Sequence, residues 1–235
     1  AGDVVAYYLP GALTAPRQVS VLPPSASLTL APTLRENWLR GGGKGNDGAW
    51  RNAERLFLSE HRGLSFGRGN VTASPAWHSQ AQTLGPGPRG KRVSEGQAAF
   101  QQFIRDHLET GCLMSAALVL AHPEQYALTR ACLEKQSGLR HVCNRIHEWA
   151  FGFNVLTIVS NRETLTHRDK LSGGLEWLDE LVSIGGDDTT VLELPGVGVR
   201  FQYRSGTIVL FSGHTHLHGV SASKRERVCF AAYAR

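Results

Sequence analysis

The sequence has no apolar run of about 18 residues or more, the length that a membrane-spanning helix needs, so we expect no membrane partner. Cysteine is scarce and scattered, and Cys112, Cys132, Cys143 and Cys229 form no C-x-x-C pair. This spacing excludes a zinc ribbon and a thiol redox motif. Isolated cysteines suit a reducing compartment, the cytosol or the nucleus. The chain also has no internal repeat.

Positive charge is in excess in the first part of the chain. The net charge is +5. Residues 1–100 hold 11 Lys and Arg against 6 Asp and Glu, whereas residues 101–235 hold 14 of each kind. A basic surface attracts polyanions, of which nucleic acid is the commonest. A solvated surface without a specific partner fits the charge equally well, so charge alone does not choose between the two.

The chain is long enough to bury a sizeable core, because 41% of its 235 residues are apolar. Its length suits one large domain or two small ones. We predict a single domain, residues 1–235, in three parts. These are a basic, loop-rich N-terminal part (1–93), a helical support (94–150) and a strand-rich core (151–235).

Two helices are predicted in the middle part. The first begins at Ser94, with Gln97 in the capping-box position, and ends at Gly111. Its apolar residues recur at helical spacing: Phe100, Phe103, Ile104 and Leu108. The second begins at Pro123, which suits a first turn, and runs through Tyr126 and Cys132.

From Phe153 onward, short apolar runs alternate with glycine-rich turns, a pattern typical of strands. The predicted strands are 153–159, 175–184, 191–194, 199–204, 207–211 and 227–234. Helices followed by many short strands predict an α+β domain with a β-barrel or sandwich core.

A His-x-Asp pair, His167 and Asp169, follows the first of these strands. The pair alone is weak, because it occurs by chance in many chains. A further histidine, His218, comes 49 residues after Asp169. Two histidines and one carboxylate form a facial triad that leaves three positions open on an octahedral iron(II). His214 and His216 are alternative third ligands, and we favour His218 because of its interval to the next arginine.

That arginine, Arg227, follows His218 by nine residues. A 2-oxo acid that chelates iron needs a cation for its far carboxylate, and arginine pairs bidentately with a carboxylate and stays charged when buried. A cupin-type metal protein without such a cosubstrate would not need it. The ordered set of His-x-Asp, His and Arg therefore predicts an open iron site that binds a 2-oxo acid and O₂. Its spacing is similar to that of iron/2-oxoglutarate dioxygenases.

Three segments resemble the TET/JBP family of nucleic-acid-modifying dioxygenases, in particular its basidiomycete fungal branch. They are NVLTIVSNRETLTHRDK, WLDELVSIGGDDTTVLELPGVGVRFQYRSGTIVLFSG, and HGVS followed by RERVCFAAYAR. The resemblance covers Asn154 to Arg235, with a weaker likeness in WRNAERLFLS. It implies an α+β fold with a double-stranded β-helix (jelly-roll) core, flanking helices and a basic, loop-rich N-terminal part.

The resemblance also implies roles for individual residues. His167, Asp169 and His218 are expected to bind Fe(2+), and Arg227 to hold the distal carboxylate of 2-oxoglutarate. Arg162 matches a position that contacts the other end of the cosubstrate, and Asn161 lies beside it at the edge of the pocket.

Members of the family flip a base out of the duplex and oxidise 5-methylcytosine, or the methyl group of thymine, in DNA. Tyr233 occupies the stacking position, and Arg235 that of a base-contacting side chain. Ser172 replaces the acidic or amide residue that reads the cytosine edge. Lys91 and Arg92, in the basic loop at 84–92, are expected to contact the DNA.

The resemblance thus implies a nuclear enzyme that acts on double-stranded DNA containing methylated bases. It would oxidise 5-methylcytosine to 5-hydroxymethylcytosine and on to formyl and carboxyl forms. Because Ser172 departs from the family pattern, N6-methyladenine stays open as a substrate, as do RNA and protein. A DNA-binding module that has lost catalysis is the non-enzymatic alternative, and the intact ligand set with Arg227 argues against it.

Overall fold

The structure is a computed structural model, and it describes most of the chain. The described residues are 4–21, 49–58, 68–77, 85–88, 102, 104–139, 146–170 and 172–235. Lys91, Arg92 and the predicted helix start at Ser94 lie outside them.

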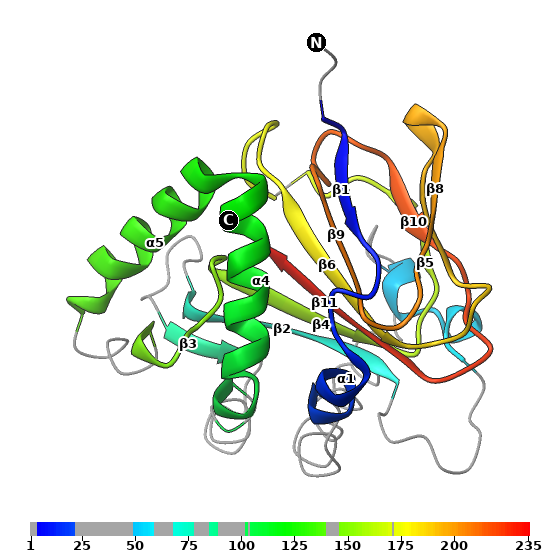
Figure 1. Cartoon of the computed structure of the whole chain (residues 1–235), viewed down its shortest axis with the longest axis horizontal. Coiled ribbons are helices and arrows are strands. Elements are labelled where there is room, and N and C mark those ends of the chain that lie inside the picture. Colours follow the sequence, from blue (N-terminus) through cyan, green and yellow to red (C-terminus); the bar gives the residue numbers. More distant parts are fainter. Residues whose placement is uncertain are drawn as a thin grey trace.

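The strands form two sheets in which every neighbouring pair is antiparallel (Figure 1). The larger sheet has the order β1 (Ala6–Leu9), β9 (Thr207–Phe211), β6 (Asp179–Gly185), β11 (Arg227–Tyr233), β4 (Val155–Ser160), β2 (Gly69–Trp77) and β3 (Gly85–Pro88). The smaller sheet has the order β5 (Thr164–His167), β10 (His218–Val220), β7 (Val191–Leu194) and β8 (Val199–Gln202). Three 3₁₀ turns are also described: η1 (Ala49–Asn52), η2 (Glu54–Leu56) and η3 (Pro195–Val197).

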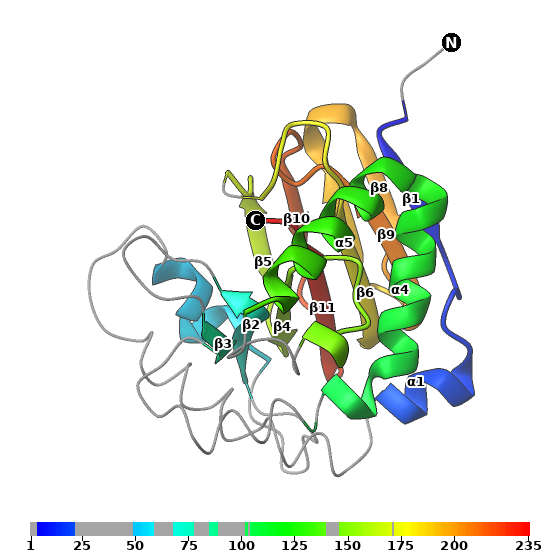
Figure 2. The same cartoon turned by 90° about the vertical axis from the view of Figure 1, so that its left-hand side faces the viewer.

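The two sheets face each other across a shared apolar core. Leu192 and Leu194 of β7 pack in one cluster with Val209 and Phe211 of β9. On the opposite face of the larger sheet lie α4 (Leu108–Ala121) and α5 (Pro123–Ser137) (Figure 2). A short helix, α1 (Ala15–Val21), follows β1. The larger sheet is therefore buried on both faces, and the α+β class expected from the sequence is confirmed.

Strand alternation sorts the residues of the larger sheet between these two faces. On β6, Val182 and Ile184 point into the core beneath the helices, whereas Leu181 packs toward the smaller sheet. Gln125 of α5 joins the helix layer to β6, because its side chain donates to the carbonyl of Leu178 and accepts from the Leu178 N–H, both at 2.8 Å. Ser183 has the same parity as Leu181, so it also faces the space between the sheets. None of the described helices is long and apolar enough to cross a membrane.

The first predicted helix does not end at Gly111, which lies inside α4. Glycine is needed there for packing, because a Cβ atom would come within 3.1 Å of the Ala150 Cβ and 3.3 Å of the Phe151 ring. The predicted strand at 175–184 begins only at Asp179. The second helix, from Pro123, is confirmed.

Glu180 of β6 is fully buried, and neither of its carboxylate oxygens has a hydrogen-bond partner among the described residues. Burial raises its pKa well above the usual range. The protonated Glu180 carboxyl is the form that the fold accommodates. Its contribution to the free energy of unfolding is therefore fully present below the ordinary pKa of glutamate and is lost as the pH rises through the raised pKa of Glu180. We expect Glu180→Gln to increase the free energy of unfolding at about pH 8 by roughly 1–3 kcal/mol, with little change at about pH 4.

Urea unfolding of both proteins across this pH range tests the expectation, with the exposed Glu134→Gln variant as the control. Equal pH dependence in the wild type and Glu180→Gln would contradict it.

Candidate metal centre

The two histidines of the centre face each other across a strand pair. His167 ends β5 and His218 begins β10, and the two residues are Cα partners in the antiparallel register. Their ring centroids lie 4.3 Å apart. Gly219 permits the close approach of the strands, because a Cβ atom there would lie 3.1 Å from both the Thr164 carbonyl oxygen and the Thr166 Oγ1. The pairing thus brings two imidazoles from distant parts of the sequence together.

Backbone carbonyls fix the orientation of both rings. His167 Nδ1 lies 2.8 Å from the Leu165 carbonyl oxygen, and His218 Nδ1 lies 3.1 Å from that of His216. A ring nitrogen that bonds to a carbonyl carries the hydrogen and donates it. Nε2 of each ring is then the nitrogen available to a metal, the arrangement that metal-binding histidines usually have.

Asp169 completes the group two residues beyond His167. Its Oδ1 lies 3.4 Å from His167 Nε2, and its Oδ2 lies 3.4 Å from His218 Nε2. Its backbone N–H donates to the Gly213 carbonyl at 2.9 Å, which holds the loop in place. One ligand atom from each of the three residues lies within 4.8 Å of the other two.

Opposing effects act on the pKa of Asp169. Burial raises the pKa of this carboxyl, but the ring N–H groups of His167 and His218 more than offset it and bring the pKa well below its usual range. The group is therefore a carboxylate between two imidazoles at neutral pH. Metal binding needs an ionised carboxylate and unprotonated Nε2 atoms, so protons compete with a divalent cation here.

Of the three histidines in GHTHLHG, the geometry favours His218. His214 Nδ1 lies 3.3 Å from the Ser172 carbonyl oxygen, and His216 contributes its carbonyl to the ring of His218. Within the described part of the chain, the group of ligand atoms contains His218 and neither of the others. The turn at 213–216 thus favours His218 over His214 and His216 as the third ligand, a choice that the sequence left open.

Arg227 begins β11 and is buried between the sheets. Its Nε donates to Ser183 Oγ at 3.1 Å, and its guanidinium carbon lies 5.1 Å from the centre of the Tyr203 ring. Asn161 holds its backbone, since the Asn161 side-chain oxygen accepts from the Arg227 N–H and the Asn161 N–H donates to the Arg227 carbonyl, both at 2.8 Å.

No carboxylate among the described residues forms an ion pair with Arg227. Two nearby hydroxyls, Thr190 Oγ1 and Thr207 Oγ1, are buried and have no hydrogen-bond partner in the same part of the chain. Thr207 is the register partner of Ser183. A buried cation among unpaired hydroxyls fits a ligand that brings its own carboxylate.

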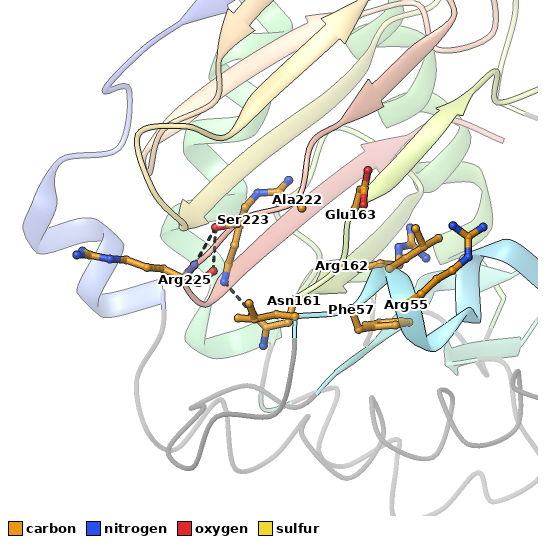
Figure 3. Close-up of a pocket in the computed structure, with 11 residues that line it drawn as sticks. Arg55, Phe57, Asn161, Arg162, Glu163, Ala222, Ser223 and Arg225 are labelled. Carbon is orange, nitrogen blue, oxygen red and sulfur yellow. Dashed lines mark hydrogen bonds between the residues drawn. The ribbon is translucent and has the colours of Figure 1, made fainter.

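Arg162 lines a cavity of about 190 Å³ together with Asn161 and Arg227 (Figure 3). Asn161 has a left-handed backbone conformation, with φ of 56°, at the turn between β4 and β5. Burial, then the neighbouring charge of Arg51, lowers the pKa of Arg162 to about 10, so it stays charged at neutral pH. Its Nε is buried and has no hydrogen-bond partner among the described residues.

The residues predicted to contact the base lie at the end of β11 and beside Asp169. Tyr233 is half-buried, and its hydroxyl lies 3.4 Å from Thr157 Oγ1. The exposed Arg235 bonds through its backbone to the Asn154 side chain. Ser172 is buried, and its N–H donates to the Asp169 carbonyl at 2.9 Å.

Two groups near the centre were not found from the sequence. Asp179 is buried and accepts a hydrogen bond from the Ser172 hydroxyl; burial raises its pKa to about 7. Asp179 lies within the run 175–184, which predicts a strand, and its spacing in the sequence does not mark it as a residue of the site. Trp50 and Arg51 also reach the metal ligands, and the only sequence signal for them was the weak likeness in WRNAERLFLS.

The antiparallel double sheet, the His-Asp-His group and the buried arginine together define an iron(II)- and 2-oxoglutarate-dependent oxygenase. The chain belongs to the TET/JBP family, because the family model for the oxygenase domain of the 2OGFeDO superfamily matches residues 80–235. Iron(II) and 2-oxoglutarate are therefore its cofactors. His167, Asp169 and His218 fit the metal, and Arg227 fits the carboxylate of the cosubstrate.

One solved structure shows the same fold. NgTET1 in complex with 5mC DNA is 13% identical, with a TM-score of 0.54 over 99% of this chain and 73% of that one. This likeness confirms the double-stranded β-helix. A collagen prolyl hydroxylase of Paramecium bursaria Chlorella virus-1 (11% identity, TM-score 0.28, 34% and 57% of the two chains) and a prolyl-4-hydroxylase of Pseudomonas putida (14%, 0.27, 40% and 59%) are more distant. No curated protein sequence matches the chain.

We expect His167→Ala and Asp169→Ala each to weaken the binding of Mn(II), a stand-in for iron(II), by more than about 100-fold. Loss of a direct ligand should exceed the 10–100-fold effect of losing an outer-shell partner. Titration of Mn(II) followed by electron paramagnetic resonance measures the affinity, with His214→Ala as the control that keeps all three ligands. Wild-type affinity in either ligand variant would refute the assignment.

We expect Arg227→Gln to weaken the binding of 2-oxoglutarate to the Mn(II)-loaded protein by about 10–100-fold. A charge-assisted hydrogen bond to the distal carboxylate contributes roughly 1.5–3 kcal/mol, and glutamine removes the charge and is shorter than arginine. Calorimetric titration measures the affinity, and Arg204→Gln, at a surface arginine paired with Asp188, is the control. An unchanged dissociation constant would place the anchor elsewhere.

Proposed function

We propose that this protein oxidises the methyl group of 5-methylcytosine in double-stranded DNA to a hydroxymethyl group, and further to formyl and carboxyl forms. The observation that carries the proposal is the Ser172–Asp179 pair, which lies directly beside the metal ligand Asp169 in a TET/JBP chain. NgTET1, which shares the fold, was solved with 5mC DNA. A substrate in genomic DNA would place the protein in the nucleus.

The cofactors supply the oxidation when bound, with O₂ as the oxidant and succinate and CO₂ as coproducts. The chain's own contribution is position and selection. Arg227 would orient the cosubstrate by its distal carboxylate, and the apolar cluster between the sheets, whose Phe211 ring packs against His218, would limit the entry of water. Tyr233, at the opposite end of β11 from Arg227, would present its ring to an extruded base.

The hydrogen bond from Ser172 to Asp179 supports a preference for one kind of base edge. A hydroxyl has one hydrogen, and while Asp179 is ionised that of Ser172 goes to its carboxylate. In this state only the oxygen lone pairs of Ser172 remain, and they would accept from a base. The exocyclic amino group of 5-methylcytosine is a donor and fits, whereas O4 of thymine is an acceptor and does not.

N6-Methyladenine is the second candidate, because its exocyclic nitrogen keeps one N–H that Ser172 would also accept. The acidic or amide side chain that reads the base edge in the family pattern is replaced here by Ser172, which is hydrogen-bonded to Asp179. Replacement of Ser172 by Asn would restore an amide, and the ratio of the two activities in this variant reports whether position 172 contributes to the choice of base.

Nucleoside mass spectrometry tests the proposal. The protein with iron(II) is incubated with duplexes that carry 5-methylcytosine or N6-methyladenine, with and without 2-oxoglutarate. We expect hydroxymethylcytosine only when 2-oxoglutarate is present, and none from Asp169→Ala. Conversion of N6-methyladenine alone would favour the second candidate. DNA binding without succinate formation would favour a module that has lost catalysis.

A further inference from the structure

A short segment from the N-terminal part lies against the metal centre. The η1 turn carries Trp50 and Arg51 and is followed by residues 54–58, which dock on the β4–β5 connection. The Leu58 N–H donates to the Asn161 carbonyl at 2.8 Å, and the Glu163 N–H donates to the Leu56 carbonyl at 2.7 Å. Leu56 and Phe57 are buried there. These contacts fix where η1 lies with respect to β5 and its terminal histidine.

Arg51 contacts both the metal ligand Asp169 and Arg162, the arginine expected to contact the cosubstrate. Its Nη2 lies 3.5 Å from Asp169 Oδ1, and its carbonyl accepts a hydrogen bond from Arg162 Nη1 at 2.8 Å. Both side chains of the Arg51–Asp169 pair are about two-fifths exposed. An ion pair of this exposure contributes little to the stability of the fold. Any effect of Arg51 on the metal centre would therefore come from the orientation that it gives the Asp169 carboxylate.

Trp50 packs between the charged groups and a metal ligand. Its ring contacts the His167 ring edge to face, with centroids 5.3 Å apart. The guanidinium carbons of Arg51 and Arg162 lie 4.6 and 5.5 Å from the Trp50 ring centre. Cation–π contacts of this kind hold an arginine over an aromatic face. Trp50 therefore limits the movement of Arg51, Arg162 and His167 together.

We propose that Trp50 and Arg51 are positioning residues of the iron centre. Arg51 contacts Oδ1 of Asp169 and would limit the rotation of the carboxylate, so that it presents the same oxygen to the metal. A carboxylate that binds through one atom would leave three positions open for the cosubstrate and O₂. The proposal rests on the metal centre and not on the identity of the substrate. Both residues precede the part that the family model matches, residues 80–235.

The test compares Arg51→Gln and Arg51→Lys with Arg200→Gln, which removes a surface arginine paired with Glu193. The first measurement is Mn(II) affinity. We expect a loss of about 10–100-fold for Arg51→Gln, as for outer-shell partners of metal ligands, and a smaller loss for Arg51→Lys, which keeps the charge. Arg200→Gln should bind Mn(II) as the wild type does.

The second measurement is the visible charge-transfer absorption of the iron(II)–2-oxoglutarate complex, recorded without O₂. A change in how Asp169 binds iron should shift this band in Arg51→Gln, while the melting temperature stays within about 2 °C because the ion pair is exposed. Trp50→Phe keeps a ring against His167 and should retain most of the affinity, whereas Trp50→Leu should not.

An Arg51→Gln variant with wild-type Mn(II) affinity and an unshifted band would overturn the proposal. So would equal losses in Arg51→Gln and Arg200→Gln. If Arg51→Gln melts at a much lower temperature, the residue is a structural support instead, and the proposal is equally overturned. None of these readouts depends on oxidation of a base, so the proposed function can fail without affecting the result.

Discussion

The antiparallel pairing of β5 with β10 is the constraint on which the metal centre depends. Its register makes His167 and His218 direct partners, and Asp169 follows within reach of both rings. A slip of one residue would turn every side chain of the slipped strand to the other face of the sheet. The donor set therefore exists only in this register, which the close contact of Gly219 with Thr164 and Thr166 helps to specify.

The larger sheet fixes the two ends of the site relative to each other. Arg227 and Tyr233 lie six residues apart on β11, so strand alternation puts them on the same face. They are separated by about 20 Å of extended chain. Because β11 pairs on both sides, with β4 and β6, this distance cannot change without breaking two ladders. One central strand thus carries both Arg227, the proposed anchor of the cosubstrate, and Tyr233, the proposed contact of the base.

Much of the metal centre could be predicted from the sequence, because its residues occur in a fixed order and at recognisable intervals. His167, Asp169, His218 and Arg227 each have a residue type that the chemistry requires. The choice among His214, His216 and His218 needed the structure, since the turn at 213–216 sets which ring points inward. Gly111 was misread as a helix end, because a glycine that permits helix packing looks the same in a sequence as a glycine that caps a helix.

Long-range contacts could not be read from the sequence. Trp50 and Arg51 lie more than 100 residues before the metal ligands that they contact, and β1 and β2 are identified as core strands only by their pairing with β9 and β4. The sequence placed the core at 151–235, whereas strands from residues before 80 complete the larger sheet. Without β1 and β2, β9 and β4 would become its edges and expose unpaired backbone groups.

Contacts between distant parts of the chain also build the site itself. The end of β4 leads into Asn161, which holds the backbone of Arg227, and Arg162, and both residues line the cavity. Residues 54–58 bind this connection from outside the sheet, and η1 extends from them to Asp169 and His167. The N-terminal part therefore does more than carry positive charge. It supplies a sheet neighbour to the strand that leads into the site and two side chains that contact the metal ligands, so its basic residues and the oxidation chemistry belong to one structural unit.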